Sequence, residues 1–199
     1  MELSDVVRRR RTVRSYEDRP LDPGVLDAIV AGAVRAPSAG FTQGWAFVVL
    51  EGPEQTEVFW RHTLPPDDRE TFHWPGLLRA PALVLPLASR QAYLDRYAEP
   101  DKLRARLWDP SAWPVPYWYV DCAFATMLVL LGAVDAGLGA AFFGIFRGER
   151  ELLDALGVPG DHRPIGAVAI GHPAADDRPS ASVARGRRPL DEVVHRGRW

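Results

Sequence analysis

The chain has 199 residues, of which 47% are hydrophobic and 25% charged, and its formal net charge is −2. This composition is typical of a soluble globular protein and excludes disordered and collagen-like chains. The nearly neutral charge also argues against a protein whose main role is to coat nucleic acid or an anionic membrane. At this length we expect a single domain spanning residues 1–199.

Cysteine usage and hydropathy indicate the compartment. Cys122 is the only cysteine, so no internal disulfide can form, and the first residues lack the apolar segment of a secretory signal. These features predict a cytoplasmic protein. The longest apolar run, Cys122–Val134, is shorter than the roughly 20 residues of a membrane span, so it predicts a buried core helix and no membrane association.

In the first half of the chain, apolar spacing predicts short helices and strands that alternate. The predicted helices cover residues 3–10, the stretch from Asp22 to Pro37, and 54–62. The predicted strands are Trp45–Glu51, which is expected to be buried, and Pro81–Ala88; residues 64–76 between them are predicted to be a loop. Pro86 lacks an N–H donor, which predicts that the far end of its strand lies at an edge of the sheet or at the point where the chain leaves it.

In the second half, residues 93–116 are polar, aromatic and rich in proline, which predicts an irregular excursion or lid. A long core helix is predicted over Tyr117–Ala136, followed by a strand at Ala140–Phe146 and a helix over 147–156. Pro164–Gly171 is the last predicted strand, and residues 172–199 are predicted to form an extended tail with a short helical end. Interleaved helices and strands in one core predict an α+β or mixed α/β fold.

Four consecutive arginines begin the first candidate motif, Arg8–Arg14, where a helix gives way to a strand-like segment. Guanidinium groups bind phosphate in a bidentate manner, and the hydroxyl of Thr12 can add a hydrogen bond. The segment therefore favours a phosphorylated ligand. A solvated charge run and a nucleic-acid patch are the alternatives, and the net charge disfavours the second.

Two further motifs flank the predicted core. The turn Ala36–Trp45 joins a helix to a strand, and its small residues and hydroxyls could lie along the edge of a flat heteroaromatic ligand. It is not a nucleophile elbow, because Ala36 occupies the position of the first glycine of G-x-S-x-G. In the tail, Arg185 and Arg187 alternate as on one face of an extended segment, which allows a second phosphate contact or simply a soluble surface.

Taken in order, these motifs resemble those of the nitroreductase-like flavoproteins. The resemblance covers nearly the whole chain. The matching segments are Arg10-Arg11-Thr12-Val13-Arg14, Ala36-Pro37-Ser38, Gln43 with Trp45, Gly137-Leu138-Gly139, Phe142–Ile145, Gly171-His172-Pro173 and Arg185–Leu190. The family resemblance implies a dimeric three-layer α-β-α sandwich around a central mixed sheet, with FMN bound at the interface between subunits.

The resemblance also implies which residues would bind the flavin. Arg10, Arg11 and Thr12, with Arg187 and Arg185 from the tail, would hold its phosphate and ribityl chain. Arg14 would lie near the pyrimidine edge, where positive charge stabilises the reduced flavin. The ring would be lined by Pro37, Ser38, Ala39 and Gln43, with the first three coming from the second subunit, and by the backbone of Phe143, Gly144 and Ile145.

The implied activity is an NAD(P)H-dependent oxidoreductase. NADH or NADPH would deliver hydride to flavin N5 and leave before a small flat acceptor binds, such as a nitroaromatic, a quinone or an enone. No G-x-G-x-x-G follows a predicted strand, so a Rossmann site is not indicated. This ping-pong chemistry needs no fixed acid or base, and we expect no catalytic side chain.

Two departures from the family pattern support an alternative. Phe41 stands where many members have Asn, and Gly44 replaces the usual Pro before Trp45. A member that binds flavin without reductase activity, or that lacks flavin and binds another ligand, therefore remains the competing hypothesis.

Other polar and aromatic groups in the middle of the chain carry weaker expectations. The aromatic side chains of the excursion could cap the flavin face, although large aromatics also dominate cores and dimer interfaces. The acidic and histidine residues between His62 and His73 lack the spacing of a metal site, and we expect no metal.

Overall fold

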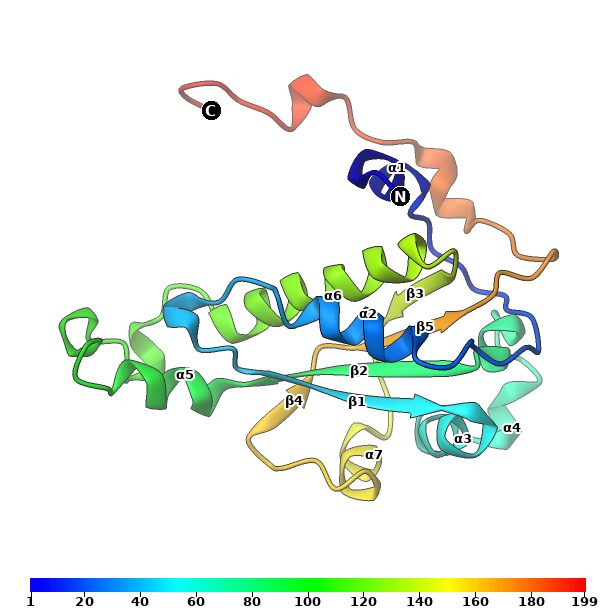
Figure 1. The fold of residues 1–199 in the computed structure, drawn as a ribbon, viewed down its shortest axis with the longest axis horizontal. Coiled ribbons are helices and arrows are strands. Elements are labelled where there is room, and N and C mark those ends of the chain that lie inside the picture. Colours follow the sequence, from blue (N-terminus) through cyan, green and yellow to red (C-terminus); the bar gives the residue numbers. More distant parts are fainter.

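The computed structural model describes all residues from 1 to 199, and its centre is a five-stranded sheet (Figure 1). The strands are β1 (Trp45–Glu51), β2 (Ala82–Ser89), β3 (Gly139–Phe143), β4 (His162–Pro164) and β5 (Ala167–Gly171). They follow the order β1-β2-β5-β3, and β4 pairs with the second half of β2.

Helices cover both faces of this sheet (Figure 1). One face carries α2 (Val25–Ala33) and α6 (Tyr117–Asp135), with α1 (Leu3–Arg9) against α6. The other carries α3 (Gly52–Thr63), α4 (Pro66–Arg69) and α7 (Glu149–Ala155), while α5 (Arg90–Tyr97) continues from the end of β2. The predicted three-layer α-β-α sandwich is therefore confirmed.

Alternation along β2 explains the two hydrophobic layers. Ala82 and Val84 pack in the cluster beneath α2 and α6, whereas Leu83 and Leu85 pack in the cluster beneath α3 and α7. Successive side chains of a strand point to opposite faces, so a strand covered on both sides must be apolar throughout. All eight residues of β2 are buried.

The sheet is antiparallel in every strand pairing, although a mixed sheet was predicted. Its only parallel contact is an isolated bridge between Thr12 and Ala140. β2 and β3 run in the same direction, but β5 lies between them and pairs antiparallel with both, so no two neighbouring strands are parallel.

Pro86 lies inside the central strand, so the prediction of an edge position was wrong. On the side of β2 away from β1, β5 pairs as far as Val84 and β4 begins opposite Leu87. The Pro86 carbonyl accepts the N–H of Ile165 at 3.1 Å in the gap between the two. A strand residue points its N–H and C=O to the same side, so the missing N–H of Pro86 also faces this gap and breaks no regular ladder.

Gly166 explains why the predicted strand Pro164–Gly171 is split. Its φ is +149°, and a Cβ there would lie 2.6 Å from the carbonyl oxygen of Phe143. The break also ends β3 at Phe143, three residues earlier than predicted, because Phe143 pairs with Ala167 and no strand residue remains beyond it.

The other predicted boundaries need smaller corrections. The helix expected from Asp22 starts at Val25, because Gly24 adopts a left-handed conformation with φ of +77°. The excursion begins with a regular helix, α5, whose first turn is capped by Ser89, which accepts the N–H of Ala92 at 3.1 Å. The predicted loop 64–76 contains the short α4. The remaining helices and β1 are confirmed to within a few residues.

The C-terminal tail extends beyond the sandwich. The tail from residue 178 is almost entirely exposed and extended, with two single 3-10 turns, and it runs away from the sheet on the α6 side (Figure 1).

Helix α6 is the one helix long and apolar enough to cross a membrane. Its inner stripe of Cys122, Ala125 and Val129 is fully buried, as expected for the core helix of a soluble protein.

We expect Cys122 to be unreactive in the folded protein. Its thiol is fully buried, and burial raises its pKa to about 12, which removes the thiolate that reacts with disulfide reagents. Labelling by dithiobis(nitrobenzoate) at pH 8 should be at least about a hundredfold slower in buffer than in urea. The matched control, Cys122→Ala with Ala155→Cys on the exposed side of α7, should react at once. Rapid native labelling of Cys122 would contradict this packing.

Candidate functional site

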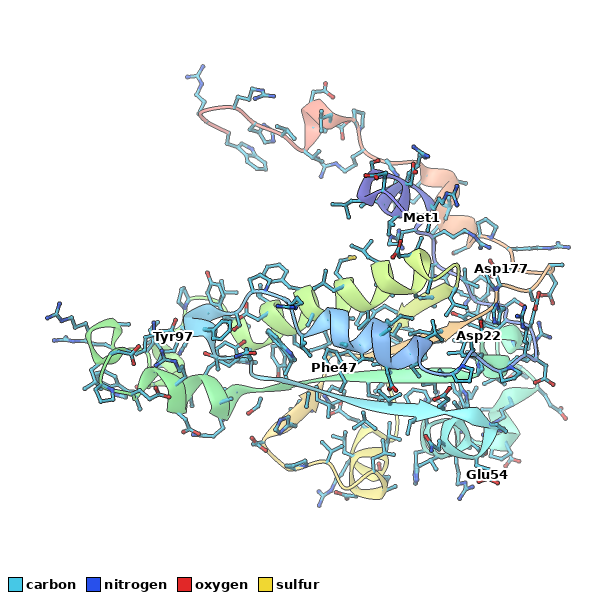
Figure 2. The ribbon with its side chains drawn as sticks, in the orientation of Figure 1. Met1, Asp22, Phe47, Glu54, Tyr97 and Asp177 are labelled. Carbon is cyan, nitrogen blue, oxygen red and sulfur yellow. The ribbon has the colours of Figure 1, made fainter.

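The residues predicted to bind a ligand fall into groups at different places on the sheet. Thr12 bridges to Ala140, whose partner Ile170 lies opposite Ala82 at the start of β2. The turn before Trp45 lies at the other end of β1, a strand of seven residues or roughly 20 Å. Figure 2 shows this separation: Asp177 lies beside residues 10–15, which we call the Arg segment, and Tyr97 lies beyond the other end of β1.

The Arg segment, residues 10–15, is fixed by its backbone to the edge of the sheet. Val13 donates its N–H to the carbonyl of Ala140 at 3.0 Å and is itself buried. The hydroxyl of Tyr16 lies 2.8 Å from the carbonyl oxygen of Val13 and 3.1 Å from that of Ala169. Burial, the main cause, raises the pKa of Tyr16 far above its ordinary value, so this anchor stays protonated. The backbone that carries the side chains of Arg10, Thr12 and Arg14 is therefore held in place.

Asp177 neutralises one of the arginines. Its side chain is only 1% exposed, and it accepts the backbone N–H groups of Arg14 at 2.8 Å and Ser15 at 3.0 Å. It also pairs with the guanidinium of Arg11. Arg11 was predicted to contact a phosphate, but in this chain its charge is already matched by a buried carboxylate.

Arg10, Thr12 and Arg14 remain free for a ligand. No hydrogen bond or ion pair engages the guanidinium groups of Arg10 or Arg14 or the hydroxyl of Thr12. The Arg14 guanidinium carbon lies 4.8 Å from the ring centroid of Trp74, which is a cation–π contact. The sheet edge thus presents two unpaired positive charges, a hydroxyl and an aromatic ring.

The exit of β3 offers backbone donors. Phe143 is held by Trp60, with parallel rings whose centroids are 5.9 Å apart. After it, the N–H groups of Gly144 and Ile145 donate to no acceptor in the chain. Phe146 is 92% exposed. These N–H groups can therefore donate hydrogen bonds to a group outside the protomer, as the predicted role of this segment requires.

The turn 37–44 is held by a buried carboxylate of α6. Asp121 is 3% exposed and accepts the N–H of Ala39 at 2.8 Å and the hydroxyl of Tyr93 at 2.7 Å. Ser38 Oγ accepts the N–H of Gln43 at 2.9 Å across the turn. The predicted ring-lining residues of the turn are thus brought together, with Pro37 exposed at its start.

The two departures from the family pattern lie in this turn. Phe41 and Gln43 both have positive φ, 54° and 52°, which is costly for residues other than glycine. Phe41 points outward and is 75% exposed. At Gly44, a Cβ would lie 2.4 Å from the ring of Tyr93, so a proline cannot fit there without moving that ring.

The tail arginines are not brought to the Arg segment within one protomer. Arg185 and Arg187 form no hydrogen bond or ion pair with any residue. The tail makes mostly local contacts, such as the pair of Arg188 with Glu192 at 3.2 Å. Their predicted phosphate contact therefore stays a prediction.

Sequence reasoning missed Asp121 and Asp177 as residues that shape the site. Asp121 had a detectable signal, because it stands one residue before Cys122 on the inner stripe of an otherwise apolar helix, where an unpaired charge would be costly. Asp177 lies in an irregular segment with no periodic pattern. Only the return of the chain past β5 brings it to Arg11.

We expect Asp121→Ala to lower the free energy of unfolding by about 2–4 kcal/mol, because the N–H of Ala39 and the hydroxyl of Tyr93 would lose their acceptor inside the protein. Asp121→Asn keeps one oxygen acceptor and should lose about half as much. In urea unfolding, the exposed control Asp154→Ala on α7 should change stability by less than about 0.5 kcal/mol. An Asp121→Ala variant as stable as this control would show that the turn is held by other contacts.

Comparison with known proteins identifies the family. The profile of the Nitroreductase family matches residues 7–172. A protein of Archaeoglobus fulgidus, provisionally named an NADH dehydrogenase/NAD(P)H nitroreductase, is 29% identical over 201 residues, covering 100% of this chain and 99% of its own. An NADPH-dependent oxidoreductase of Staphylococcus aureus is 24% identical over 201 residues, covering 98% of this chain and 73% of its own.

Solved structures share the fold. The provisionally named NADH dehydrogenase/NAD(P)H nitroreductase of Bacteroides thetaiotaomicron superposes with a TM-score of 0.72 at 17% identity, over 100% of this chain and 99% of that one. A protein of Desulfovibrio desulfuricans described as a nitroreductase in complex with FMN gives a TM-score of 0.67 at 24% identity, over 98% and 95%. The family profile covers most of the chain, and the chain therefore belongs to the Nitroreductase family.

Proposed function

We propose that this single-domain protein is an FMN-dependent oxidoreductase that takes hydride from NADH or NADPH and passes it to a small flat acceptor in a ping-pong reaction. The observation that carries the proposal is the pair of unpaired arginines, Arg10 and Arg14, beside the free hydroxyl of Thr12 at the sheet edge. Relatives named NAD(P)H nitroreductase and NADPH-dependent oxidoreductase support the choice of reaction. Nitroaromatics, quinones and enones are the proposed acceptors.

The Arg segment fits the phosphate end of FMN. Two guanidinium groups without an acidic partner, together with a hydroxyl, are the donors that a phosphate dianion prefers. Arg10 and Thr12 would bind the phosphate and the adjoining hydroxyls. Arg11 would contribute less, because Asp177 matches its charge, although only one of its guanidinium nitrogens is engaged. Arg185 and Arg187 would add to this end when the tail folds back, in the same or the other subunit.

The ring end of FMN fits the remaining groups. When bound, FMN supplies the hydride-accepting chemistry that no side chain of this protein can provide. Arg14, in contact with the ring of Trp74, would place positive charge at the flavin ring edge, where it makes electron uptake more favourable. The free N–H groups of Gly144 and Ile145 would donate to the other edge. We assign no acid or base to the reaction.

A homodimer would complete this site. Pro37, Ser38, Ala39 and Gln43 lie at the far end of the sheet from Arg10, so one copy of the chain does not enclose a flavin between them. The outer face of α6 supplies a surface for pairing. Phe124 is 48% exposed and Met127 46%, which is unusual for large apolar side chains one turn apart on a core helix. In a dimer, the turn of one subunit would cover the ring bound by the other.

A cytoplasmic location accompanies the proposal. NADH and NADPH are available as reductants there, and the single buried cysteine needs no oxidising compartment. No role with nucleic acid or membrane is proposed.

The decisive test of the cofactor is an absorbance spectrum of the purified protein with FMN, before and after anaerobic NADH or NADPH. We expect flavin bands that bleach with one of the two nucleotides. Arg14→Gln should weaken FMN binding about tenfold or more, because it removes a charged donor, while Arg19→Gln at an exposed position nearby should not. Bound flavin that never bleaches would favour a binding role. If no flavin binds, we would conclude that this family member binds another ligand, as its departures from the family pattern at Phe41 and Gly44 suggest.

A separate test addresses the dimer. Met127→Glu places a charge in the apolar outer face of α6 and should convert the protein to a monomer in light scattering, with loss of FMN binding. The control Arg61→Glu introduces a carboxylate on α3, on the opposite side of the sheet, and should leave the dimer intact. A dimer that survives Met127→Glu would place the interface elsewhere.

A further inference from the structure

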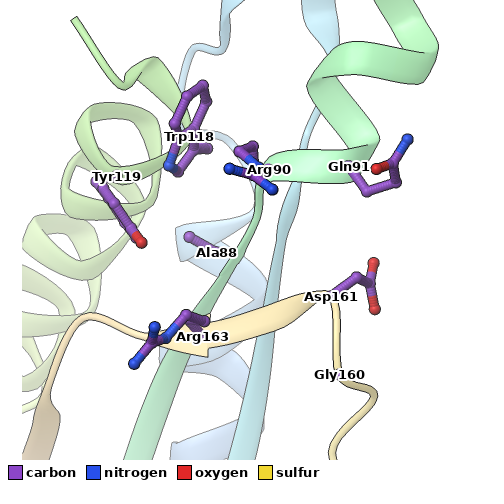
Figure 3. Close-up of a pocket in the computed structure, with 8 residues that line it drawn as sticks. All are labelled: Ala88, Arg90, Gln91, Trp118, Tyr119, Gly160, Asp161 and Arg163. Carbon is purple, nitrogen blue, oxygen red and sulfur yellow. The ribbon is translucent and has the colours of Figure 1, made fainter. Parts of the chain in front are cut away.

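A cleft of about 300 Å³ lies at the end of the sheet opposite the Arg segment (Figure 3). It is formed by the start of α6, the junction of β2 with α5, and the chain through β4. None of its lining residues belongs to the groups proposed to bind FMN. They are Ala88, Arg90, Gln91, Trp118, Tyr119, Gly160, Asp161 and Arg163.

Two of the charged groups in the cleft are already paired. Both carboxylate oxygens of Asp161 are used, one by the hydroxyl of Ser89 at 3.0 Å and one by Nδ1 of His162 at 2.9 Å. The hydrogen bond with His162, followed by that with Ser89, lowers the pKa of Asp161. Its carboxylate therefore stays ionised, with both oxygens already hydrogen-bonded. Arg163 donates from one nitrogen to Glu149 at 2.6 Å.

Arg90 is the charged group of the cleft that has no partner. Its guanidinium forms no ion pair and no hydrogen bond with the protein, although it stands at the first position of α5. The nearest lining carboxylate, Asp161, has both oxygens engaged and points away from it in Figure 3. Its five donors are therefore available to an anion.

Aromatic side chains form the wall next to Arg90. Trp118 is 8% exposed and is held rigidly, with its ring centroid 6.1 Å from that of Trp113 and 6.4 Å from that of Tyr93. Tyr119 is 40% exposed, and Figure 3 shows its hydroxyl directed toward Ala88. A rigid indole and an exposed phenol beside a guanidinium give one apolar surface and one anion-binding group.

We propose that this cleft binds a small aromatic carboxylate, with its ring against Trp118 and Tyr119 and its carboxylate paired with Arg90. A phosphate ion alone would leave the aromatic wall exposed, and a cationic ligand would find no free carboxylate. The volume is at the lower limit of small-molecule pockets, which suits a single ring. The site is complete within one protomer and does not depend on flavin binding.

The test is a titration with 4-fluorobenzoate, followed by ¹⁹F NMR, on the purified protein with and without saturating FMN. We expect binding in both states that is weakened at least about tenfold by Arg90→Gln, because a charge-assisted hydrogen bond is lost. Arg104→Gln, at an exposed arginine of the excursion, is the matched control and should bind as the unsubstituted protein does. Arg14→Gln should also leave this binding unchanged.

Four results would overturn the proposal. Equal binding of the neutral 4-fluorobenzyl alcohol would reduce the cleft to an apolar patch. Competition by inorganic phosphate at the same concentration would make it a general anion site. Loss of binding in Arg14→Gln and not in Arg90→Gln would place the ligand in the flavin site. No binding at the solubility limit of 4-fluorobenzoate would remove the site altogether.

Discussion

The arrangement of the whole molecule depends on the complete burial of β2. All eight of its residues are inaccessible, and it pairs with β1 on one side and with β5 and then β4 on the other. Both helical layers pack on it through alternate side chains. β1, β4 and β5 pair directly with β2, and β3 takes its register from β5, so β2 fixes the distance between the two ends of the sheet. Those ends carry the two halves of the candidate flavin site.

A buried carboxylate holds each half in place. At one end, Asp177 accepts two backbone N–H groups and pairs with Arg11; at the other, Asp121 accepts the N–H of Ala39 and the hydroxyl of Tyr93. Carboxylates are effective here because each can accept several hydrogen bonds from short, irregular segments that form no ladder of their own. The consequence differs between the ends. Asp177 removes Arg11 from the set of free cations, whereas Asp121 adds no competing charge to the surface that faces a ligand.

The layered fold and the long core helix were predictable, because both follow from apolar runs in the sequence. The helix from Tyr117 has the length and composition of a buried element, and the apolar run Trp45–Glu51 was recognisable as a strand. The expectation that this strand is buried was wrong, because β1 lies at an edge of the sheet and only Leu50 is buried. The sequence did not indicate which strands pair with one another. Pro86 is tolerated in the central strand only because two different strands meet beside it, and Gly166 ends two strands through a contact with Phe143 that lies far away in sequence.

The same limit applies to the candidate site. Local motifs identified the arginines, the turn and the exit of β3, because each is a continuous segment. They could not indicate which arginine is neutralised, since Arg11 and Asp177 are separated by 166 residues. They also could not indicate that Gly44 is required by the ring of Tyr93.

One helix connects the proposed dimer, the flavin turn and the arginine cleft. Successive residues of α6 are turned by about 100°, so Tyr119 faces the cleft, Asp121 faces the turn and Phe124 faces outward within less than two turns of helix. A packed helix shifts as a rigid body more easily than it bends. In the proposed dimer, a second subunit seated on Phe124 would therefore act on the same short stretch that holds the N–H of Ala39. Pairing of subunits would then influence the shape of the turn through Asp121, in addition to the contact of the turn with the flavin bound by the other subunit.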